Sequence, residues 1–210
     1  MTQPAEACLA ELSVSRETIA ALRAFEGLVQ RWSPAINLVS KASLADLWQR
    51  HILDSAQIFT LCPAKAATWV DVGSGGGFPG LVVAILAKEL KPDLQVTLVE
   101  SDLRKATFLR QAAQTLAVPV SVLSERIESV APLAADVFSA RALAPLQDLL
   151  AYADRHLAAS GTGIFPKGAR YAEELTAAKA SWLYDVDVRP SLSEAEAAIL
   201  VIRNLHRAHV

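Results

Sequence analysis

Several features that mark particular classes of protein are scarce in this 210-residue sequence. Its two cysteines, Cys8 and Cys62, lack both the CxxC spacing of redox and zinc sites and the density of a disulfide-rich domain. We expect both to be buried as small apolar residues. The four histidines form no HExxH motif, so the sequence predicts no metal centre.

Long apolar runs and an excess of charge are also missing. The longest unbroken apolar run, Leu81 to Ala87, has 7 residues, whereas a membrane-spanning helix needs about 20. The first residues lack the basic and apolar regions of a secretory signal, so we expect a cytoplasmic protein. Because the net charge is −2, any binding of nucleic acid must come from a local basic patch.

Hydrophobic spacing divides the chain into two parts. Residues 16–32 have helical periodicity that we expect Pro34 to end, and a second amphipathic stretch begins with Ser43 as its N-cap. We therefore predict an N-terminal helical cap over residues 1–62.

Residues 63–210 alternate short β-prone runs with helical ones, which is typical of an α/β domain with a parallel sheet. The segment between the last two predicted strands is too short for a crossover helix, so these strands should form an antiparallel hairpin. The result is a mostly parallel, seven-stranded sheet. The predicted strands span residues 68–72, 94–100, 118–123, 135–140, 163–165, 183–188 and 197–202, and the helices span 79–90, 102–116 and 146–157.

A glycine-rich turn, DVGSGGGFPG over residues 71–80, comes after the first predicted strand. Glycines permit positive φ and let a ligand approach the backbone, and open α/β sheets bind ligands at the carboxyl ends of their strands. The spacing Gly75-x-Gly77-x-x-Gly80 also fits the dinucleotide pattern. The turn therefore allows three hypotheses. The first is a methyltransferase that binds S-adenosylmethionine, the alternative is an oxidoreductase that binds a nicotinamide dinucleotide, and the third is a non-enzymatic binding module.

Two observations favour S-adenosylmethionine as the ligand. The carboxylate of Asp71, just before the first glycine, suits a ligand with an ammonium and a sulfonium better than a pyrophosphate. The chain also has one nucleotide-binding half, without the second half that a dehydrogenase usually carries. Glu100 closes the second strand and suits the ribose of either cofactor, so it does not discriminate.

The residues after the fourth predicted strand narrow the choice of methyl acceptor. That place reads Ser139-Ala-Arg-Ala-Leu143, which lacks the Asn/Asp-Pro-Pro-aromatic turn of enzymes that methylate exocyclic amines. It also lacks the cysteine nucleophile used for ring carbons of pyrimidines. A lone-pair nucleophile such as a guanine ring nitrogen remains, and its methylation depends mostly on alignment.

Several short strings, taken in order, resemble the RsmG family, also called GidB, over roughly residues 28–205. They are NLVS from Asn37, RHILDS from Arg50, the glycine-rich turn, LVES from Leu98, SARA from Ser139, and Lys167-Gly168. The resemblance implies a Rossmann-like, class I methyltransferase that uses S-adenosylmethionine. Its product would be 7-methylguanosine at one position of bacterial 16S ribosomal RNA. Guanine N7 carries no proton, so this reaction needs no general base.

The resemblance also assigns roles to residues. Gly73 and Phe78 would contact the cofactor, Glu100 its ribose, and Ile127 and Glu128 its adenine. Arg141, offset by one alanine from the family's usual Ser-Arg, would border the cofactor and the base. Lys167 would hold a phosphate or the guanine O6. His51 is either a locally hydrogen-bonded histidine or a residue near the guanine. The candidate catalytic residues are thus Arg141, Lys167 and His51; the candidate cofactor-binding residues are Asp71, Gly73, Gly75, Phe78, Glu100, Ile127, Glu128 and Arg141.

The expected partner is 16S ribosomal RNA, either alone or within the small subunit or an assembly intermediate. Because the sequence has no RRM or KH signature, we expect the RNA to be recognised by its shape in ribosomal structure, and naked oligonucleotides to bind weakly. We expect a monomer.

Overall fold

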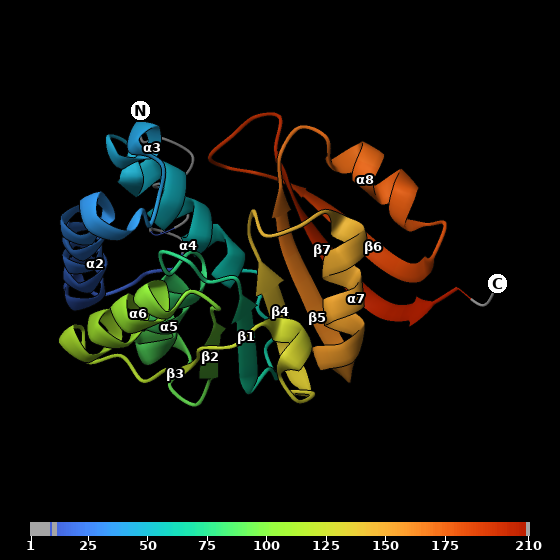
Figure 1. Cartoon of the computed structure of the whole chain (residues 1–210), viewed down its shortest axis with the longest axis horizontal. Coiled ribbons are helices and arrows are strands. Elements are labelled where there is room, and N and C mark those ends of the chain that lie inside the picture. Colours follow the sequence, from blue (N-terminus) through green and yellow to red (C-terminus); the bar gives the residue numbers. More distant parts are fainter. Residues whose placement is uncertain (1–8, 10–11, 209–210) are drawn as a thin grey trace.

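Helices come first along the chain in the computed structural model, which describes residue 9 and residues 12–208 (Figure 1). Helix α2 continues past Pro34, contrary to our prediction. A proline removes only one backbone donor, and the helix ends where Asn37 adopts a left-handed conformation and donates to the Ser33 carbonyl. The N-terminal elements are α2 (Arg16–Ile36), α3 (Lys41–Leu44), the π-helix η1 (Trp48–Leu53) and α4 (Asp54–Phe59).

The second predicted helix is broken into three pieces, and its N-cap is Ser40. The prediction of Ser43 is wrong because Ser40 has the extended backbone that a cap requires, and its hydroxyl accepts a hydrogen bond from the Ser43 N–H at 3.2 Å. Both serines suit a cap, and the sequence does not show which one is extended.

Seven strands form one sheet in the order β3-β2-β1-β4-β5-β7-β6. The first five strands in that order are parallel, whereas β7 is antiparallel to both β5 and β6. The predicted α/β fold with a terminal antiparallel hairpin is confirmed. The strands are β1 (Thr68–Val72), β2 (Gln95–Val99), β3 (Ser121–Leu123), β4 (Ala135–Ala140), β5 (Leu157–Lys167), β6 (Trp182–Pro190) and β7 (Ala198–Arg207).

Four α-helices and one 3₁₀ turn connect the strands: α5 (Gly80–Leu90), α6 (Leu103–Thr115), η2 (Ile127–Ser129), α7 (Leu146–His156) and α8 (Tyr171–Ala178). Two elements differ from the prediction. Strand β5 is longer than residues 163–165, because Leu157 and Thr162 also pair with β4, with a bulge between them, and Pro166 and Lys167 pair with β7. Helix α8 was not predicted at all.

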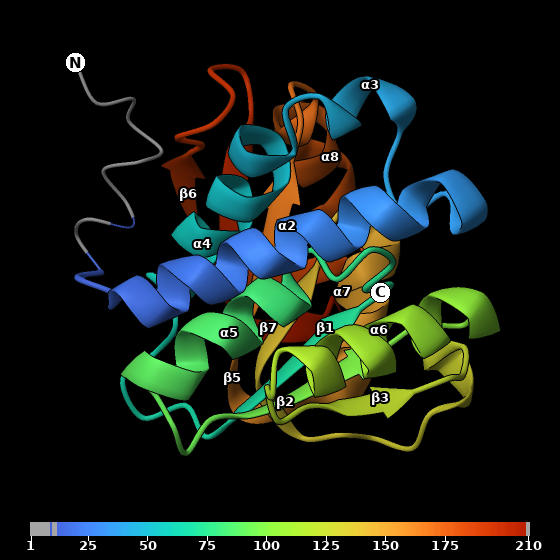
Figure 2. The same ribbon diagram turned by 90° about the vertical axis from the view of Figure 1, so that its left-hand side faces the viewer.

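Each face of the sheet carries its own hydrophobic core. Side chains alternate along a strand, so Val137 and Ile199 join the core with α2, α4, α5 and α6, whereas Phe138 and Leu200 join the core with α7 and α8. Figure 2 shows α2 lying across α5 and α6. Leu22 and Phe25 of α2 belong to the same core as β-strand residues, so the cap and the sheet share buried surface.

Outcomes for the remaining predictions are mixed. Cys62 is half-buried, with its thiol donating to the Pro63 carbonyl, so the expectation of full burial is wrong there. Cys8 lies outside the described residues. Across residues 9 and 12–208, no helix is long and apolar enough to cross a membrane, and no cluster of His, Cys, Asp or Glu is arranged to hold a metal ion.

Candidate functional site

The glycine-rich turn connects β1 to α5 and takes backbone conformations that favour glycine. Gly73, Gly75 and Gly77 have φ values of 65°, 52° and 90°. A Cβ at Gly73 would lie 2.7 Å from the Leu143 side chain, and one at Gly77 would lie 2.9 Å from the Phe25 ring. The turn therefore needs glycine both for its conformation and for the close approach of neighbouring side chains.

Asp71 lies beneath this turn and not on the surface that a ligand would contact. The residue is fully buried, and its carboxylate accepts hydrogen bonds from the Ser139 hydroxyl at 2.7 Å and from the Gly80 N–H at 3.1 Å. Burial raises the pKa of Asp71 to about 6. The expectation that this carboxylate faces the cofactor differs from the structure, in which it fixes the start of α5.

Glu100 comes directly after β2 and holds the turn from the other side. Its two carboxylate oxygens accept from the N–H groups of Gly75 and Asp102, each at 2.8 Å. A carboxylate has about four lone-pair positions, so two remain for other donors. Glu100 thus already organises the loop and can still accept from hydroxyl groups.

Ile127 and Glu128 form η2 after β3. The Ile127 side chain is buried, and its carbonyl lies 3.2 Å from His156 Nε2. Glu128 accepts from the Tyr152 hydroxyl at 2.8 Å, and hydrogen bonds from its own N–H and from Tyr152 lower its pKa. These contacts leave the conformation of η2 well defined.

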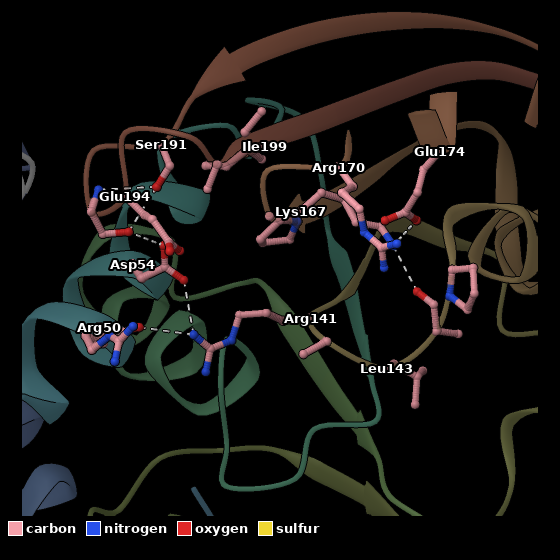
Figure 3. Close-up of a pocket in the computed structure, with 18 of the residues that line it drawn as sticks. Arg50, Asp54, Arg141, Leu143, Lys167, Arg170, Glu174, Ser191, Glu194 and Ile199 are labelled. Atoms are coloured by element: carbon pink, nitrogen blue, oxygen red, sulfur yellow. Dashed lines mark hydrogen bonds and ion pairs between the residues drawn. The ribbon is translucent and has the colours of Figure 1, made fainter. Parts of the chain in front are cut away.

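Arg141 comes directly after β4 and connects the sheet to the cap. One guanidinium nitrogen, Nη1, donates to the Asp54 carboxylate at 3.1 Å and to the Arg50 carbonyl at 3.2 Å, and Nη2 lies 2.5 Å from His51 Nδ1 (Figure 3). The guanidinium also lies above the Phe78 ring, 5.4 Å from its centroid. Arg141 therefore joins η1 and α4 to the glycine-rich turn.

His51 is held in its neutral form. Its pKa falls to about 3, because burial and then the positive charges of Arg141 and Arg50 disfavour the imidazolium. Arginine can only donate, so His51 Nδ1 is the acceptor and the proton is on Nε2. That Nε2 is buried and has no partner among the described residues.

Phe78 is enclosed by the cap. Its ring stacks on His51 with centroids 5.0 Å apart, and the Phe25 ring lies 5.2 Å away on α2. Since Phe78 is only 5% exposed, most of its surface is used to fix the turn against the helices.

Lys167 lies at the end of β5 and anchors the loop after β4. Its ammonium donates to the Ala144 carbonyl at 2.9 Å and to the Glu174 carboxylate at 2.7 Å. The same carboxylate accepts from the Leu146 N–H at 2.6 Å. Lys167 and Glu174 together hold the segment from Arg141 to Leu146 against α8.

A cavity of about 1010 Å³ brings these groups together (Figure 3). The cap, the loop after β4, the start of α8 and the loop between β6 and β7 line it. Arg141, His51 and Lys167 all face this space, whereas Asp71, Gly75, Glu100, Ile127 and Glu128 are not among its lining residues. Leu143 lines the cavity and also lies over Gly73, so the cavity reaches the edge of the glycine-rich turn at this side chain.

Most of the chain is similar to one known protein family. A model of the GidB family, described as rRNA small subunit methyltransferase G, matches residues 18–202. The chain belongs to this family. It is 52% identical over 197 residues to Ribosomal RNA small subunit methyltransferase G of Ruegeria sp. (strain TM1040), across 94% of this chain and 96% of the relative. The relative in Parvibaculum lavamentivorans (strain DS-1) is 48% identical, across 92% and 86% of the two chains.

Solved structures support the fold that is expected of the GidB family. A SAM dependent methyltransferase from Aquifex aeolicus has a TM-score of 0.58 at 13% identity, covering 75% of this chain and 92% of the other. The ribosomal protein L11 methylase of Lactobacillus delbrueckii subsp. bulgaricus has a TM-score of 0.57 at 21% identity, with coverage of 76% and 79%. The chain is thus a small-subunit rRNA methyltransferase with the Rossmann-like fold of S-adenosylmethionine-dependent enzymes, and the oxidoreductase alternative is not supported.

Sequence reasoning missed two residues that shape the site. Leu143 carried no motif signal, and its position over Gly73 depends on how the loop after β4 folds. Glu174 could have been found from its place among helix-forming residues after Lys167, with Glu173 beside it in the first turn of α8.

Proposed function

We propose that this protein transfers the methyl group of S-adenosylmethionine to N7 of one guanine in 16S ribosomal RNA. The observation that carries the proposal is the contact between the two halves of the site. Arg141 and His51 line the cavity, and both contact Phe78 of the glycine-rich turn. A donor on the turn and an acceptor in the cavity would thus lie side by side.

The residues around the turn suit the proposed cofactor. A Cβ at Gly75 would meet only the Gly73 carbonyl, at 3.6 Å, so a ligand can approach the turn there, and Glu100 retains lone pairs for the two ribose hydroxyls. Ile127 and Glu128, after β3, would border the adenine through their main chain. Asp71 would act through the shape of the turn, and Phe78 through the contact between turn and cap.

The chemistry requires orientation and no proton transfer. When bound, S-adenosylmethionine supplies a methyl group on a positively charged sulfur, which a ring nitrogen with a free lone pair accepts without losing a proton. His51, with a pKa of about 3, is neutral at pH 7 and would position Arg141, from which Nδ1 accepts, and Phe78, on which its ring stacks. It would be neither general acid nor general base.

Lys167 suits the guanine O6 better than a phosphate. Two of its three N–H donors are used, and Glu174 compensates its charge, so it has one donor and little net charge to offer. Arg141 is similarly paired with Asp54. Both would orient the base and stabilise the charge distribution of the transition state.

We further propose that the acceptor is presented in the small subunit or an assembly intermediate, in the cytoplasm, and that the enzyme acts as a monomer. With a net charge of −2 the protein as a whole does not attract polyanions, so we expect naked RNA to bind weakly. Recognition would then depend on the shape of the RNA in the ribosomal structure.

Titration calorimetry and mass mapping test this function. We expect S-adenosylmethionine to bind, NAD to give no heat, and a 7-methylguanosine to be missing from 16S RNA of cells without the protein. Gly73→Asp should abolish cofactor binding, because φ there is 65° and a side chain would enter the space filled by Leu143. Gly27→Ala, on α2 with open space around it, is the control. No binding of S-adenosylmethionine at millimolar concentration would contradict the proposal.

A further inference from the structure

The charged groups that line the cavity fall into two kinds. Arg141 is paired with Asp54, and Lys167 with Glu174, so these four residues contribute little net charge. Arg50 and Arg170 also line the cavity, and their guanidinium groups have no hydrogen-bond or ion-pair partner among the described residues. The positive charge available to a ligand is therefore concentrated in two side chains.

These two arginines come from distant parts of the chain. Arg50 belongs to η1 in the cap, and Arg170 caps the start of α8. Both are exposed, and in Figure 3 they lie to either side of Arg141. A ligand that contacted both would thus span the cavity above the residue that joins it to the glycine-rich turn.

Two carboxylates in the cavity, those of Glu173 and Glu194, are also unpaired among the residues described. A groove built only for the RNA backbone would not place free carboxylates beside its arginines. A guanine nucleotide does combine an anionic phosphate with N1–H and N2–H donors, which carboxylates accept. The mixture of free charges therefore favours a whole guanine nucleotide as the occupant.

The acceptor atom must also be reachable. Guanine N7 lies in the major groove, which in A-form RNA is too deep and narrow for side chains to enter. Enzymes that modify a base in a folded nucleic acid commonly turn the nucleotide out of the strand into a pocket. At about 1010 Å³ the cavity is large enough, since ligand pockets measure about 300 to 1,000 Å³.

We propose that Arg50 and Arg170 bind the phosphates on either side of the acceptor guanosine when it is turned out of the RNA into this cavity. The inference rests on the proposed function and adds the two residues that hold the backbone. The guanidinium of neither residue contacts the glycine-rich turn, and the Arg50 carbonyl that accepts from Arg141 is kept in an alanine variant, so we expect both side chains to act on RNA binding.

The test uses small ribosomal subunits purified from cells that lack this protein. Methyl transfer to them is measured with Arg50→Ala, Arg170→Ala and the double variant at several salt concentrations. We expect KM for the subunit to rise roughly tenfold for each change, with kcat within about twofold. The slope of log KM against log salt should fall by about 0.7 to 0.9 per arginine removed.

Two controls keep the result specific. Arg203→Ala removes an exposed arginine of β7 that does not line the cavity and should match the wild type. Arg50→Lys and Arg170→Lys should recover most of the salt slope, and calorimetry should give unchanged binding of S-adenosylmethionine in every variant.

The outcomes separate the two proposals. Wild-type KM and salt slope in the alanine variants, with an active wild-type enzyme, would overturn the role of the arginines and leave the proposed function intact. A wild-type enzyme that methylates no guanine N7 in the subunit would overturn the proposed function itself. A fall in kcat at unchanged KM would place the arginines in orientation of the base and would also contradict the inference.

Discussion

His51 is the residue whose ionisation the fold changes most clearly. Its Nδ1 accepts from Arg141 and its ring covers Phe78, so the neutral form is built into the contact between cap and turn. Guanine N7 has no proton to remove, and a histidine that cannot take one at pH 7 is compatible with that chemistry. Because the folded state disfavours the imidazolium, the protein should lose stability as the pH is lowered.

We predict that His51→Gln reduces the loss of stability at low pH. In wild type the pKa of His51 is about 3 in the folded state and about 6.5 in the unfolded state. Between these pH values the unfolded state binds more protons, so the free energy of unfolding decreases as the pH is lowered. From pH 7 to pH 5 the wild type should lose about 1 to 2 kcal/mol more than the variant, after allowance for its partial exposure.

Urea unfolding at the two pH values measures this difference. The exposed His206→Gln is a matched control that should follow the wild-type curve. Parallel losses in wild type and His51→Gln would show that His51 does not carry the acid sensitivity.

At the level of elements, the loop after β4 depends on a neighbour that sequence reasoning did not place. Helix α8 supplies Glu174, which binds both Lys167 and the Leu146 N–H. The loop thereby holds Arg141 toward the cap and Leu143 over Gly73.

We predict that Lys167→Met destabilises the protein by about 1 to 3 kcal/mol, because Lys167 is nearly buried and its loss leaves the Glu174 carboxylate without a cation. Glu174→Gln should cost less, since an amide oxygen can still accept. In urea unfolding the double variant should lose less than the sum of the two single variants. Additive losses would mean that the pair does not act as a unit.

Sequence patterns were sufficient for most elements but not for their contacts. The parallel strands were predictable because buried β-prone runs alternate with helical ones, and the terminal hairpin because residues 190–196 are too short for a crossover. The breaks in the cap were not predictable, because the π-helix at Trp48–Leu53 depends on packing against α2 and the sheet. Likewise the sequence singled out Asp71 as a site residue, but it did not show that the carboxylate accepts hydrogen bonds from the Ser139 hydroxyl and the Gly80 N–H.

For the whole molecule, we interpret the helices of the cap (residues 16–59) and the sheet with its helices (residues 68–207) as one folding unit. Phe25 and Ile52 of the cap are completely buried in the core that contains Trp69 of β1 and Leu98 of β2. Removal of the cap would expose much of that core, and apolar exposure costs about 25 cal/mol per Å².

We therefore predict a single cooperative unfolding transition. Hydrogen exchange should give the slowest amides of α2 and of β1 the same free energy of opening, and urea should unfold both at one midpoint. S-adenosylmethionine should raise both midpoints equally. Earlier unfolding of α2, with the sheet intact, would instead make the cap a separate domain.

The position of Leu143 has a consequence for inhibitor design. It lines the cavity, is 41% exposed, and occupies the space that a side chain at Gly73 would need, so it alone covers the first glycine of the turn on this side. A compound seated between Arg50 and Arg170 needs only to displace that side chain to extend a substituent toward the glycines. An inhibitor of the cavity with a short substituent at this position would thus also contact the glycine-rich turn.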